Sequence, residues 1–507
     1  MKPNMIYHRT HIRTTLRRGL FSVTLSCLVV AASTIPDVHG QQPTASQEAA
    51  SVRWTRLTHQ PAFDTDSANL LTDGRVLVHE YSSANWWILT PDINGSYLNG
   101  TWSQAASMQS DYGPLYFANS VLPDGRVIVE GGEYNFLSQN WTNKGAIYNP
   151  VTNFWATVNP PVGWTHIGDS PGIVQADGVF MLGHAGLGAN TQQALFNAAT
   201  LTWTAVGATG KSDTFSEEGI CLLPDSTMLT VDTQNIPNSE RYDPSTQHWT
   251  SAGSTIVPLA DRGSLEIGPA LQRPDGTVIW FGGTPHTARF NIATGTWAQG
   301  PDYPNSNDSA DGPASLLPDG NILVPASPGV FQGSITMFIF DGVSFAQAPP
   351  TQSSSSLQSW QTRTLILPTG EIMYLVADGS TRDVELLTSR GRPDPSWAPR
   401  IRSVPATLTR GGTFQISGIQ FNGLSVGSDY GDDALGATNY PIVRITNVAT
   451  RHVFYCRTHD HSTMAIATGN TPVSTMFDVP ASTETGASKI QVIANGISSS
   501  AKQVTVQ

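Results

Sequence analysis

The sequence predicts an all-β protein, a seven-bladed β-propeller followed by a smaller β-sandwich. Three observations predict this fold. The 507 residues include 46 glycines and 34 prolines but only 13% charged residues, and no long stretch has helical periodicity, which indicates many short strands and turns. A hairpin motif recurs seven times at regular spacing. The repeats stop near Arg390, and the remaining residues follow a different pattern.

The first forty residues have the pattern of a secretory signal peptide. A basic start is followed by an apolar run from Leu20 to Ala32, and Val38-His39-Gly40 offers a small-residue cleavage site. A single transmembrane anchor is the alternative, but the run is short for a span. We therefore expect a secreted or periplasmic protein without stable membrane insertion after residues 1–40 are removed.

The charge of the chain disfavours nucleic acid as a partner. The net charge is −12, and removal of residues 1–40 takes away five basic residues and one acidic residue, which leaves −16. Phosphates would be repelled by such a surface. Only Cys221 and Cys456 remain after cleavage, so no disulfide framework is predicted. We expect a monomer whose core is held by apolar burial.

Each repeat has an apolar strand, a tight Asp-Gly-type turn and a second apolar strand, which is the signal of a β-hairpin. Consecutive turns are 44 to 53 residues apart. The turn positions are Asp73, Asp124, Asp177, Asp225, Asp275, Asp319 and Thr369. Four repeats contain a second turn that ends in tryptophan, at 148–155, 196–203, 242–249 and 290–297. Two turns in phase predict four-stranded blades, and seven repeats predict seven blades over residues 50–390.

Closure of the ring requires a strand from outside the repeats. Trp54 to Leu57 precede the first repeat, and we expect them to add a strand to the last blade. Two stacked β-sandwiches are the alternative architecture for this region.

The residues after the repeats are predicted to form a second domain. The stretch GRPDPSWAPR at 391–400 contains three prolines and is typical of a linker. Five strand-like runs follow, which fit one immunoglobulin-like sandwich over residues 398–507. The Gly- and Asp-rich loop between Phe421 and Tyr440 is interpreted as solvated, with a calcium site as the alternative.

This organisation resembles the kelch-type galactose oxidase and glyoxal oxidase family over nearly all of residues 41–507. The double glycine of kelch blades is present as Gly131-Gly132 and Gly282-Gly283. In that family a hairpin of the sandwich enters the channel of the propeller and brings a copper ligand on a Thr-His pair. Thr458-His459 is similar to that element, so the resemblance implies that Thr458 to Met464 enter the channel.

The resemblance also implies where the remaining site residues lie. The family's ligands stand at the start of innermost strands, eight or nine residues before each hairpin turn. At these positions the sequence offers Asp64, Tyr116, Asp169, Glu217, Asp311, Trp360 and Gln361 as candidate ligand-binding residues. His459 and His461 are the candidate metal ligands.

The set of copper ligands that the resemblance implies is incomplete. Tyr116 matches the family's tyrosine, but Thr65 stands where its cysteine belongs and Trp360-Gln361 replace its Tyr-His. Thiolates and imidazoles suit copper, whereas this ring is rich in carboxylates. Copper therefore remains open as a cofactor, and we expect the copper-radical chemistry to be lost.

Two classes of function remain open. A binding module could hold a glycan or a similar small polar ligand between carboxylates and the rings of Tyr116 and Trp360. An enzyme with a remodelled site is the alternative, either a metal-dependent oxidoreductase of the galactose or glyoxal oxidase type or a glycan hydrolase that uses paired carboxylates. The missing family residues favour the binding module.

The segment from Thr458 to Met464 has a structural interpretation as well. A His-Asp-His tip is costly to bury unless its polar groups are paired. We expect His459 and His461 to meet acidic residues of the channel mouth, which would favour the protonated imidazole and lock the two domains together.

Overall fold

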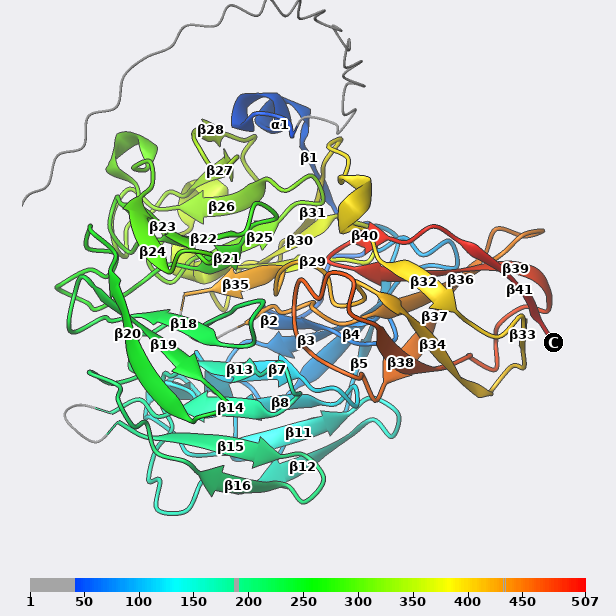
Figure 1. The fold of residues 1–507 in the computed structure, drawn as a ribbon, viewed down its shortest axis with the longest axis horizontal. Coiled ribbons are helices and arrows are strands. Elements are labelled where there is room, and N and C mark those ends of the chain that lie inside the picture. Colours follow the sequence, from blue (N-terminus) through cyan, green and yellow to red (C-terminus); the bar gives the residue numbers. More distant parts are fainter. Residues whose placement is uncertain (1–41, 187–190, 432, 434) are drawn as a thin grey trace, which may run out of the picture. The chain divides into compact units, whose positions relative to one another are not determined.

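The computed structural model describes residues 42–186, 191–431, 433 and 435–507, so the proposed signal peptide lies outside the described residues. The described part is nearly all β-structure (Figure 1). Its α-helix α1 (Ala45–Ser51) begins at Thr44, whose side chain forms a capping box with Gln47. No helix within this part of the chain is long and apolar enough to cross a membrane.

Six four-stranded antiparallel sheets and one five-stranded sheet form the seven blades, which confirms the predicted propeller. The first blade consists of β2 (Thr65–Leu70), β3 (Val76–Glu80), β4 (Trp86–Thr90) and β5 (Thr101–Gln104). The second blade consists of β7 (Ala118–Val121), β8 (Val127–Glu130), β11 (Gly145–Asn149) and β12 (Phe154–Val158). The third and fourth consist of β13 (Gly172–Val174), β14 (Phe180–Gly183), β15 (Gln193–Asn197) and β16 (Thr202–Ala205), and of β17 (Cys221–Leu222), β18 (Met228–Val231), β19 (Asn238–Asp243) and β20 (His248–Ser254).

The remaining blades follow the same order. The fifth and sixth consist of β21 (Ala270–Gln272), β22 (Thr277–Phe281), β23 (Thr287–Asn291) and β24 (Thr296–Gln299), and of β25 (Pro313–Leu316), β26 (Ile322–Ala326), β27 (Thr336–Phe340) and β28 (Phe345–Gln347). The seventh consists of β29 (Thr362–Ile366), β30 (Ile372–Val376), β31 (Val384–Thr388) and β1 (Arg53–Arg56). A small extra sheet joins β6 (Pro114–Leu115), β9 (Tyr134–Asn135) and β10 (Ser138–Gln139).

The recurring hairpin turns have a common local cause. In six blades the Asp carboxylate accepts a hydrogen bond from the backbone N–H two residues on, as Asp73 does from Arg75 at 3.1 Å and Asp124 from Arg126 at 3.0 Å. In the first turn the next residue, Gly74, adopts a φ of +79°, which a residue without Cβ reaches at no steric cost. In these six blades the local bond fixes the turn that ends the innermost strand.

The recurring tryptophans pack between neighbouring blades. Trp249 of the fourth blade donates its indole N–H to Gln193 of the third at 2.8 Å. Trp297 of the fifth blade donates to Ser239 of the fourth, also at 2.8 Å. Trp249 and Trp297 therefore each satisfy their one donor while they fill the space between two sheets.

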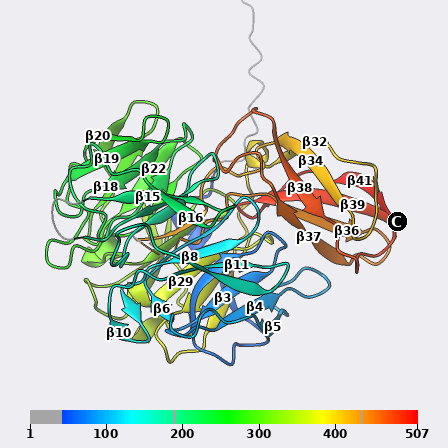
Figure 2. The ribbon, with the colours of Figure 1, turned by 90° about the horizontal axis from the view of Figure 1, so that it is seen from below.

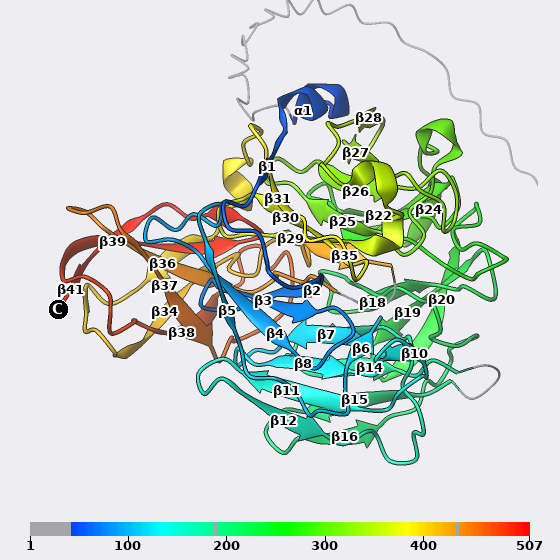
Figure 3. The ribbon, with the colours of Figure 1, turned by 180° about the vertical axis from the view of Figure 1, so that it is seen from behind.

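The N-terminal strand closes the ring as predicted. Strand β1 pairs antiparallel with β31 of the seventh blade, with Trp54 opposite Leu387. Figures 1 and 3 show this blue strand beside the yellow strands of the last blade. Closure pairs the strand edges that an open sheet would leave exposed.

The C-terminal residues form the predicted sandwich, which groups apart from the blades in Figure 2. Its strands are β32 (Arg400–Ser403), β33 (Thr407–Leu408), β34 (Thr413–Ile419), β36 (Ile442–Asn447), β37 (Val453–His459), β38 (Val473–Asp478), β39 (Gly486–Ala494), β40 (Ile497–Ser498) and β41 (Lys502–Val506). Strand β37 pairs with β36 and, near its end, with β38, so one sheet continues into the other around an apolar core that includes Ile416, Val443 and Phe477.

The loop between Phe421 and Tyr440 is buried, so its interpretation as a solvated loop is wrong. Its strand β35 (Ser428–Tyr430) pairs with β25, the innermost strand of the sixth blade. Asp429 accepts a hydrogen bond from the backbone N–H of Ala270 in the fifth blade at 2.6 Å. We call residues 422–431, 433 and 435–440 the plug, because they bring residues of the C-terminal part of the chain in among the innermost strands of the propeller. Figures 1 and 3 show β35 between β25 and β18.

Glu130 in β8 is a buried carboxylic acid whose burial is energetically costly. Its side chain is 0% exposed, and neither carboxylate oxygen has a hydrogen-bond partner among the described residues. Burial raises the pKa of Glu130 well above its usual range. The stabilising contribution of this group is therefore complete below the pKa of the unfolded chain, about 4.3, and is lost as pH rises toward the folded-state value.

We expect Glu130→Met to stabilise the protein by about 1–3 kcal/mol at pH 8, because an apolar side chain of similar size needs no hydrogen bond there. The gain should shrink toward pH 5. Urea unfolding at both pH values measures it, with Glu130→Gln as the matched control that removes the charge but keeps a buried polar group. A Glu130→Met variant that is less stable than the wild type at pH 8 would contradict this account of the site.

Candidate functional site

A cavity of about 710 Å³ opens where the innermost strands begin. Because each innermost strand runs from this end to its hairpin turn, residues just before the strands meet here. Its lining residues are Tyr81, Leu115, Tyr116, Glu133, Tyr134, Leu137, Asp169, Glu217, Ser264, Glu266, Asp311, Phe331, Gln358, Trp360 and Asp433. We call this space the mouth cavity. It brings together five of the seven residues predicted to lie at the channel mouth: Tyr116, Asp169, Glu217, Asp311 and Trp360.

Three lining residues were missed because they follow the second strand of a blade rather than precede the first. Tyr81 follows β3, and Glu133 and Tyr134 follow β8. The second strand returns from the hairpin turn to the mouth, so its end lies at the same side as the start of the first strand. Counting forward from each turn as well as backward would have found these residues.

Backbone strain gathers at this cavity. Tyr116, Glu217 and Asp311 stand eight residues before their turns in alternate blades, and have φ values of +53°, +60° and +45°. A residue with a Cβ in this region costs about 1–3 kcal/mol and persists only where the surrounding structure requires it. The equivalent backbone conformation in three blades therefore places three side chains in the wall of the mouth cavity.

Three of the carboxylates lie very close together. The carboxylate oxygens of Glu217, Glu266 and Asp311 lie within 4.8 Å of one another. At that spacing two ionised carboxylates repel by roughly 3 kcal/mol or more at an effective dielectric constant near 20. A proton or a cation between them is favoured for this reason. We call these three residues the carboxylate triad.

Aromatic rings form the other part of the wall. The ring of Tyr116 meets that of Trp360 edge to face, with centroids 6.2 Å apart, and that of Tyr134 at 5.9 Å. The indole N–H of Trp360 donates to Gln358 at 2.5 Å, which fixes the ring. Burial raises the pKa of Tyr116 far above its usual range, so its phenol remains neutral. The cavity thus combines flat apolar faces with acidic groups.

The plug contributes part of the wall of the mouth cavity. Asp433 is one of the lining residues, and the hydroxyl of Tyr430 donates to the backbone carbonyl of Trp360 at 3.0 Å. The guanidinium of Arg363 lies 3.9 Å from the centroid of the Tyr430 ring and 3.5 Å from Asp66. Tyr430 and Arg363 are both almost fully buried. The plug therefore fixes Trp360 through its backbone and holds Arg363 beneath the cavity.

The other two predicted residues do not line the cavity. Asp64 forms an ion pair with Arg382 at 2.9 Å. The side-chain oxygen of Gln361 accepts a hydrogen bond from the backbone N–H of Gln358 at 2.9 Å, which caps its own turn, η3 (Ser359–Gln361).

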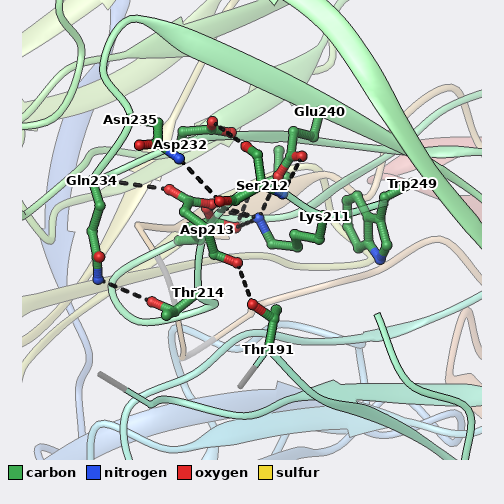
Figure 4. Close-up of polar contacts among 12 residues, drawn as sticks. Thr191, Lys211, Ser212, Asp213, Thr214, Asp232, Gln234, Asn235, Glu240 and Trp249 are labelled. Atoms are coloured by element: carbon green, nitrogen blue, oxygen red, sulfur yellow. Dashed lines mark hydrogen bonds and ion pairs between the residues drawn. The ribbon is translucent and has the colours of Figure 1, made fainter. Parts of the chain in front are cut away.

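The loop that carries Glu217 is held by a buried lysine. The ammonium of Lys211 contacts one carboxylate oxygen of Asp213, one of Glu240 and both of Glu218 at 2.7 to 2.9 Å. Figure 4 shows Lys211 with Asp213, Glu240 and the neighbouring Ser212 and Asp232. We call Lys211, Asp213, Glu218, Asp232 and Glu240 the Lys211 cage. Glu217 and Glu218 are adjacent in sequence, yet one faces the mouth cavity and the other the Lys211 cage.

The Lys211 cage holds more acid than base. Burial alone would lower the pKa of Lys211, but the three contacting carboxylates raise it above its usual value, so the ammonium stays charged. Burial, and then Asp213 and Glu240, raise the pKa of Asp232 to about 7. The hydroxyl of Ser212 donates a hydrogen bond to the side chain of Asp232 at 3.0 Å. Burial also raises the pKa of Glu218 well above its usual range, so Asp232 and Glu218 are the cage carboxyls that take up a proton most readily.

The predicted placement of the two histidines is wrong. His459 contacts Asp460 at 2.8 Å and Asp478 at 3.3 Å, and His461 contacts the Thr475 hydroxyl at 2.9 Å. None of these partners lines the mouth cavity. Burial lowers the pKa of His461 to about 3, with a smaller contribution from His459, so its imidazole is neutral rather than protonated.

Residues 458–464, which carry both histidines, contact the hairpin turns. These turns lie at the ends of the innermost strands that are away from the mouth cavity. The backbone N–H groups of Thr458, His461 and Met464 donate to the carbonyls of Thr72, Pro123 and Ala176. Each acceptor immediately precedes the Asp of a hairpin turn in the first, second or third blade. The segment therefore joins the two domains, as one interpretation predicted, but at the end of the channel away from the mouth cavity.

Comparisons with known proteins agree with this architecture. No family model matches the chain. A kelch-like protein, terF, of Aspergillus terreus (strain NIH 2624 / FGSC A1156) is 22% identical over 360 residues, which cover 65% of this chain and 73% of that protein. A solved fungal alcohol oxidase of the AA5 family, in complex with copper, is similar over 90% of this chain and 98% of its own, with a TM-score of 0.50 and 14% identity. The structure of YjhT is similar over 58% of this chain and 99% of its own, with a TM-score of 0.37 and 13% identity.

The galactose oxidase-like kelch fold is thereby confirmed, and the copper in the solved alcohol oxidase raises the question whether these residues fit that metal. No histidine or cysteine is among the described residues that line the mouth cavity. Thr65 is buried and donates to the carbonyl of Val376 at 2.7 Å, and both Cys221 and Cys456 are buried elsewhere. Copper in proteins favours imidazole, thiolate and thioether ligands, so the donors of this cavity do not fit it.

Proposed function

We propose that this chain, which has the galactose oxidase-like kelch fold, is an exported binding module that holds a glycan or a closely similar polar ligand in the mouth cavity. The observation that carries the proposal is the composition of one cavity. Aromatic rings that could stack on sugar rings stand beside carboxylates that could accept hydrogen bonds from hydroxyl groups. Its volume of about 710 Å³ falls within the roughly 300–1,000 Å³ of small-molecule sites.

Preorganisation supports the same proposal. The three left-handed residues, the bond that orients Trp360 and the plug beneath it hold the wall of the cavity in one arrangement before any ligand arrives. A rigid wall lowers the entropy cost of binding. Export, through removal of residues 1–40, and a monomeric state are part of this proposal.

The test is a calorimetric titration of the mature protein with a panel of mono- and oligosaccharides, followed by the variant Trp360→Ala. We expect the variant to bind the best ligand at least about tenfold more weakly, a loss of about 1.4 kcal/mol, because the stacking face is gone. Trp203→Ala is the matched control, since Trp203 is half-buried in an outer strand of the third blade. Equal affinity of Trp360→Ala and the wild type would place the ligand elsewhere.

An enzyme with a remodelled site is the second candidate. A retaining glycosidase needs two carboxyl groups about 5–5.5 Å apart and an inverting one needs roughly 6.5–9.5 Å. One oxygen from each member of the carboxylate triad lies within 4.8 Å of the others, which suits a shared proton or cation and is closer than the separation of an inverting enzyme. A retaining hydrolase therefore stays the second candidate, after the binding module.

Loss of the copper chemistry is tested separately. After dialysis against copper and gel filtration, we expect a substoichiometric copper content, no absorption band of a tyrosine radical and no peroxide from galactose, because the described lining residues include no thiolate or imidazole donor. Elemental analysis, visible spectroscopy and a peroxide assay measure the three quantities. One tightly held copper per chain together with peroxide release would favour the oxidoreductase.

A further inference from the structure

We propose that the ligand of the mouth cavity carries a positive charge, and specifically that it is a sugar with an unacetylated amino group whose ammonium binds the carboxylate triad. This inference rests on the proposed function and goes beyond it, because it names the chemical class of the ligand and the three residues that select it.

The charged side chains among the described residues that line the mouth cavity are all acidic. The acidic lining residues are Glu133, Asp169, Glu217, Glu266, Asp311 and Asp433. No lysine, arginine or histidine is among the described residues that line the cavity. Arg363 lies beneath it, held by Asp66 and stacked on Tyr430, and Arg262 is exposed on the loop before Glu266. A cluster of carboxylates in a low-dielectric space attracts cations and repels anions.

The spacing of the carboxylate triad suits an ammonium group. An ammonium has three N–H donors beside its carbon, and charge-assisted N–H···O bonds are about 2.8 Å long. Three acceptors in tetrahedral directions at that distance are about 4.6 Å apart. The oxygens of Glu217, Glu266 and Asp311 are all within 4.8 Å of one another, so one ammonium can reach all three.

The protein itself contains an ammonium site of the same kind. In the Lys211 cage, carboxylate oxygens that also lie within 4.8 Å of one another contact the Lys211 ammonium at 2.7 to 2.9 Å. That ammonium lies 5.1 Å and 5.2 Å from the ring centroids of Phe215 and Trp249. The mouth cavity repeats this combination of three carboxylates and aromatic rings, and its described lining residues include no lysine.

The size and the aromatic wall point to an amino sugar rather than a bare ion. A cavity of about 710 Å³ is far larger than a single ion requires. Trp360, Tyr116 and Tyr134 offer faces that stack on sugar rings and attract a nearby cation. The ligand therefore needs both a ring and a charge.

A matched pair of ligands tests the inference. The mature protein is titrated calorimetrically at pH 6 with the β-1,4-linked disaccharide of glucosamine and with its N-acetylated counterpart, which has the same ring but no charge. We expect the free amine to bind at least tenfold more tightly. Glu266→Gln should remove most of that preference, because the amide keeps the size of the side chain but no longer pairs its charge with the ammonium.

Two controls keep the result interpretable. Glu484→Gln alters an acidic residue in a different cavity, lined by Tyr455, Arg457 and Asp478 among others, and should change neither affinity. Thermal unfolding confirms that each variant is folded, and Asp311→Asn serves as a second triad variant if Glu266→Gln is unstable. Each titration is repeated with calcium and with EDTA.

The outcomes separate this inference from the proposed function. Equal affinity for the two disaccharides overturns the ammonium site and leaves sugar binding intact. Binding that requires calcium and disappears in EDTA also overturns it, since the carboxylate triad would then hold a metal ion. If neither these disaccharides nor any other sugar of the panel binds, the proposed function itself fails. Preference for the amine that Glu266→Gln removes supports both.

Discussion

Lys211→Met is expected to destabilise the protein by about 3–5 kcal/mol at pH 8. Removal of one partner from a buried ion pair leaves an uncompensated charge, and here it leaves three contacting carboxylates, Asp213, Glu218 and Glu240, without their cation. Methionine fills a similar volume, so packing loss contributes little. Urea unfolding followed by tryptophan fluorescence measures the difference.

The effect of Lys211→Met should depend on pH in a defined direction. The folded-state pKa of Asp232, about 7, lies above the unfolded value near 3.9, so the stabilising contribution of that group is complete below about pH 4 and is lost as pH rises through 7. Without the ammonium the cage carboxyls take up protons at still higher pH. The variant should therefore be closest to the wild type near pH 5 and farthest from it at pH 8.

Lys144→Met is the matched control for the cage. Lys144 forms an ion pair with Asp111 at 2.5 Å, but both side chains are substantially exposed to solvent. Exposed pairs contribute about 0–1 kcal/mol. A Lys211→Met variant that loses no more stability than Lys144→Met would show that the cage is not a buried ion cluster.

Tyr430→Ala is expected to cost about 3–5 kcal/mol and to abolish ligand binding. The substitution removes a buried aromatic ring from the channel, and with it the surface on which the Arg363 guanidinium rests at 3.9 Å. It also removes the bond to the Trp360 carbonyl, which fixes the stacking wall. Thermal unfolding and calorimetric titration measure the two effects.

Two control variants separate the role of the plug from other effects. Tyr430→Phe loses only the hydroxyl and should cost about 1 kcal/mol, with a smaller loss of affinity. His459→Ala should leave ligand affinity unchanged, because its partners Asp460 and Asp478 belong to the sandwich rather than to the mouth cavity. If His459→Ala abolished binding and Tyr430→Ala did not, the segment of the histidines would be the true plug.

The propeller could be predicted because its signals are local. The Asp side chain of a turn such as that at Asp73 accepts a bond from only two residues on, and this Asp recurs at every innermost hairpin except the last, where Thr369 replaces it; Ser226 replaces the glycine in the fourth. Because the mouth lies a similar number of residues before each turn, counting back eight residues located Tyr116, Asp169 and Glu217 there.

The plug could not be predicted because its signal is not local. Residues 422–440 are rich in glycine and aspartate, a composition typical of a solvated loop. They are buried because β35 pairs with β25, more than one hundred residues earlier in the chain, and because Asp429 bonds to Ala270. The Thr458-His459 pair, by contrast, matched the family pattern in residue type but lies against the hairpin turns.

The Lys211 cage also escaped prediction. Its acidic residues are spread over residues 213–240, with no spacing that indicates a shared cation. Glu217 was predicted at the mouth, whereas its neighbour Glu218 belongs to the Lys211 cage. The backbone between the two sites is left-handed at Glu217, with a φ of +60°.

The measurement that tests the central claim most directly is hydrogen–deuterium exchange with and without a saturating sugar ligand. The account predicts slower exchange at the loops that build the mouth cavity, in residues 112–117, 213–219, 262–268, 308–312 and 427–431. Residues 453–478, which carry His459 and His461, should exchange unchanged. Protection confined to residues 453–478, with the mouth loops unaffected, would contradict the claim that the ligand binds in the mouth cavity.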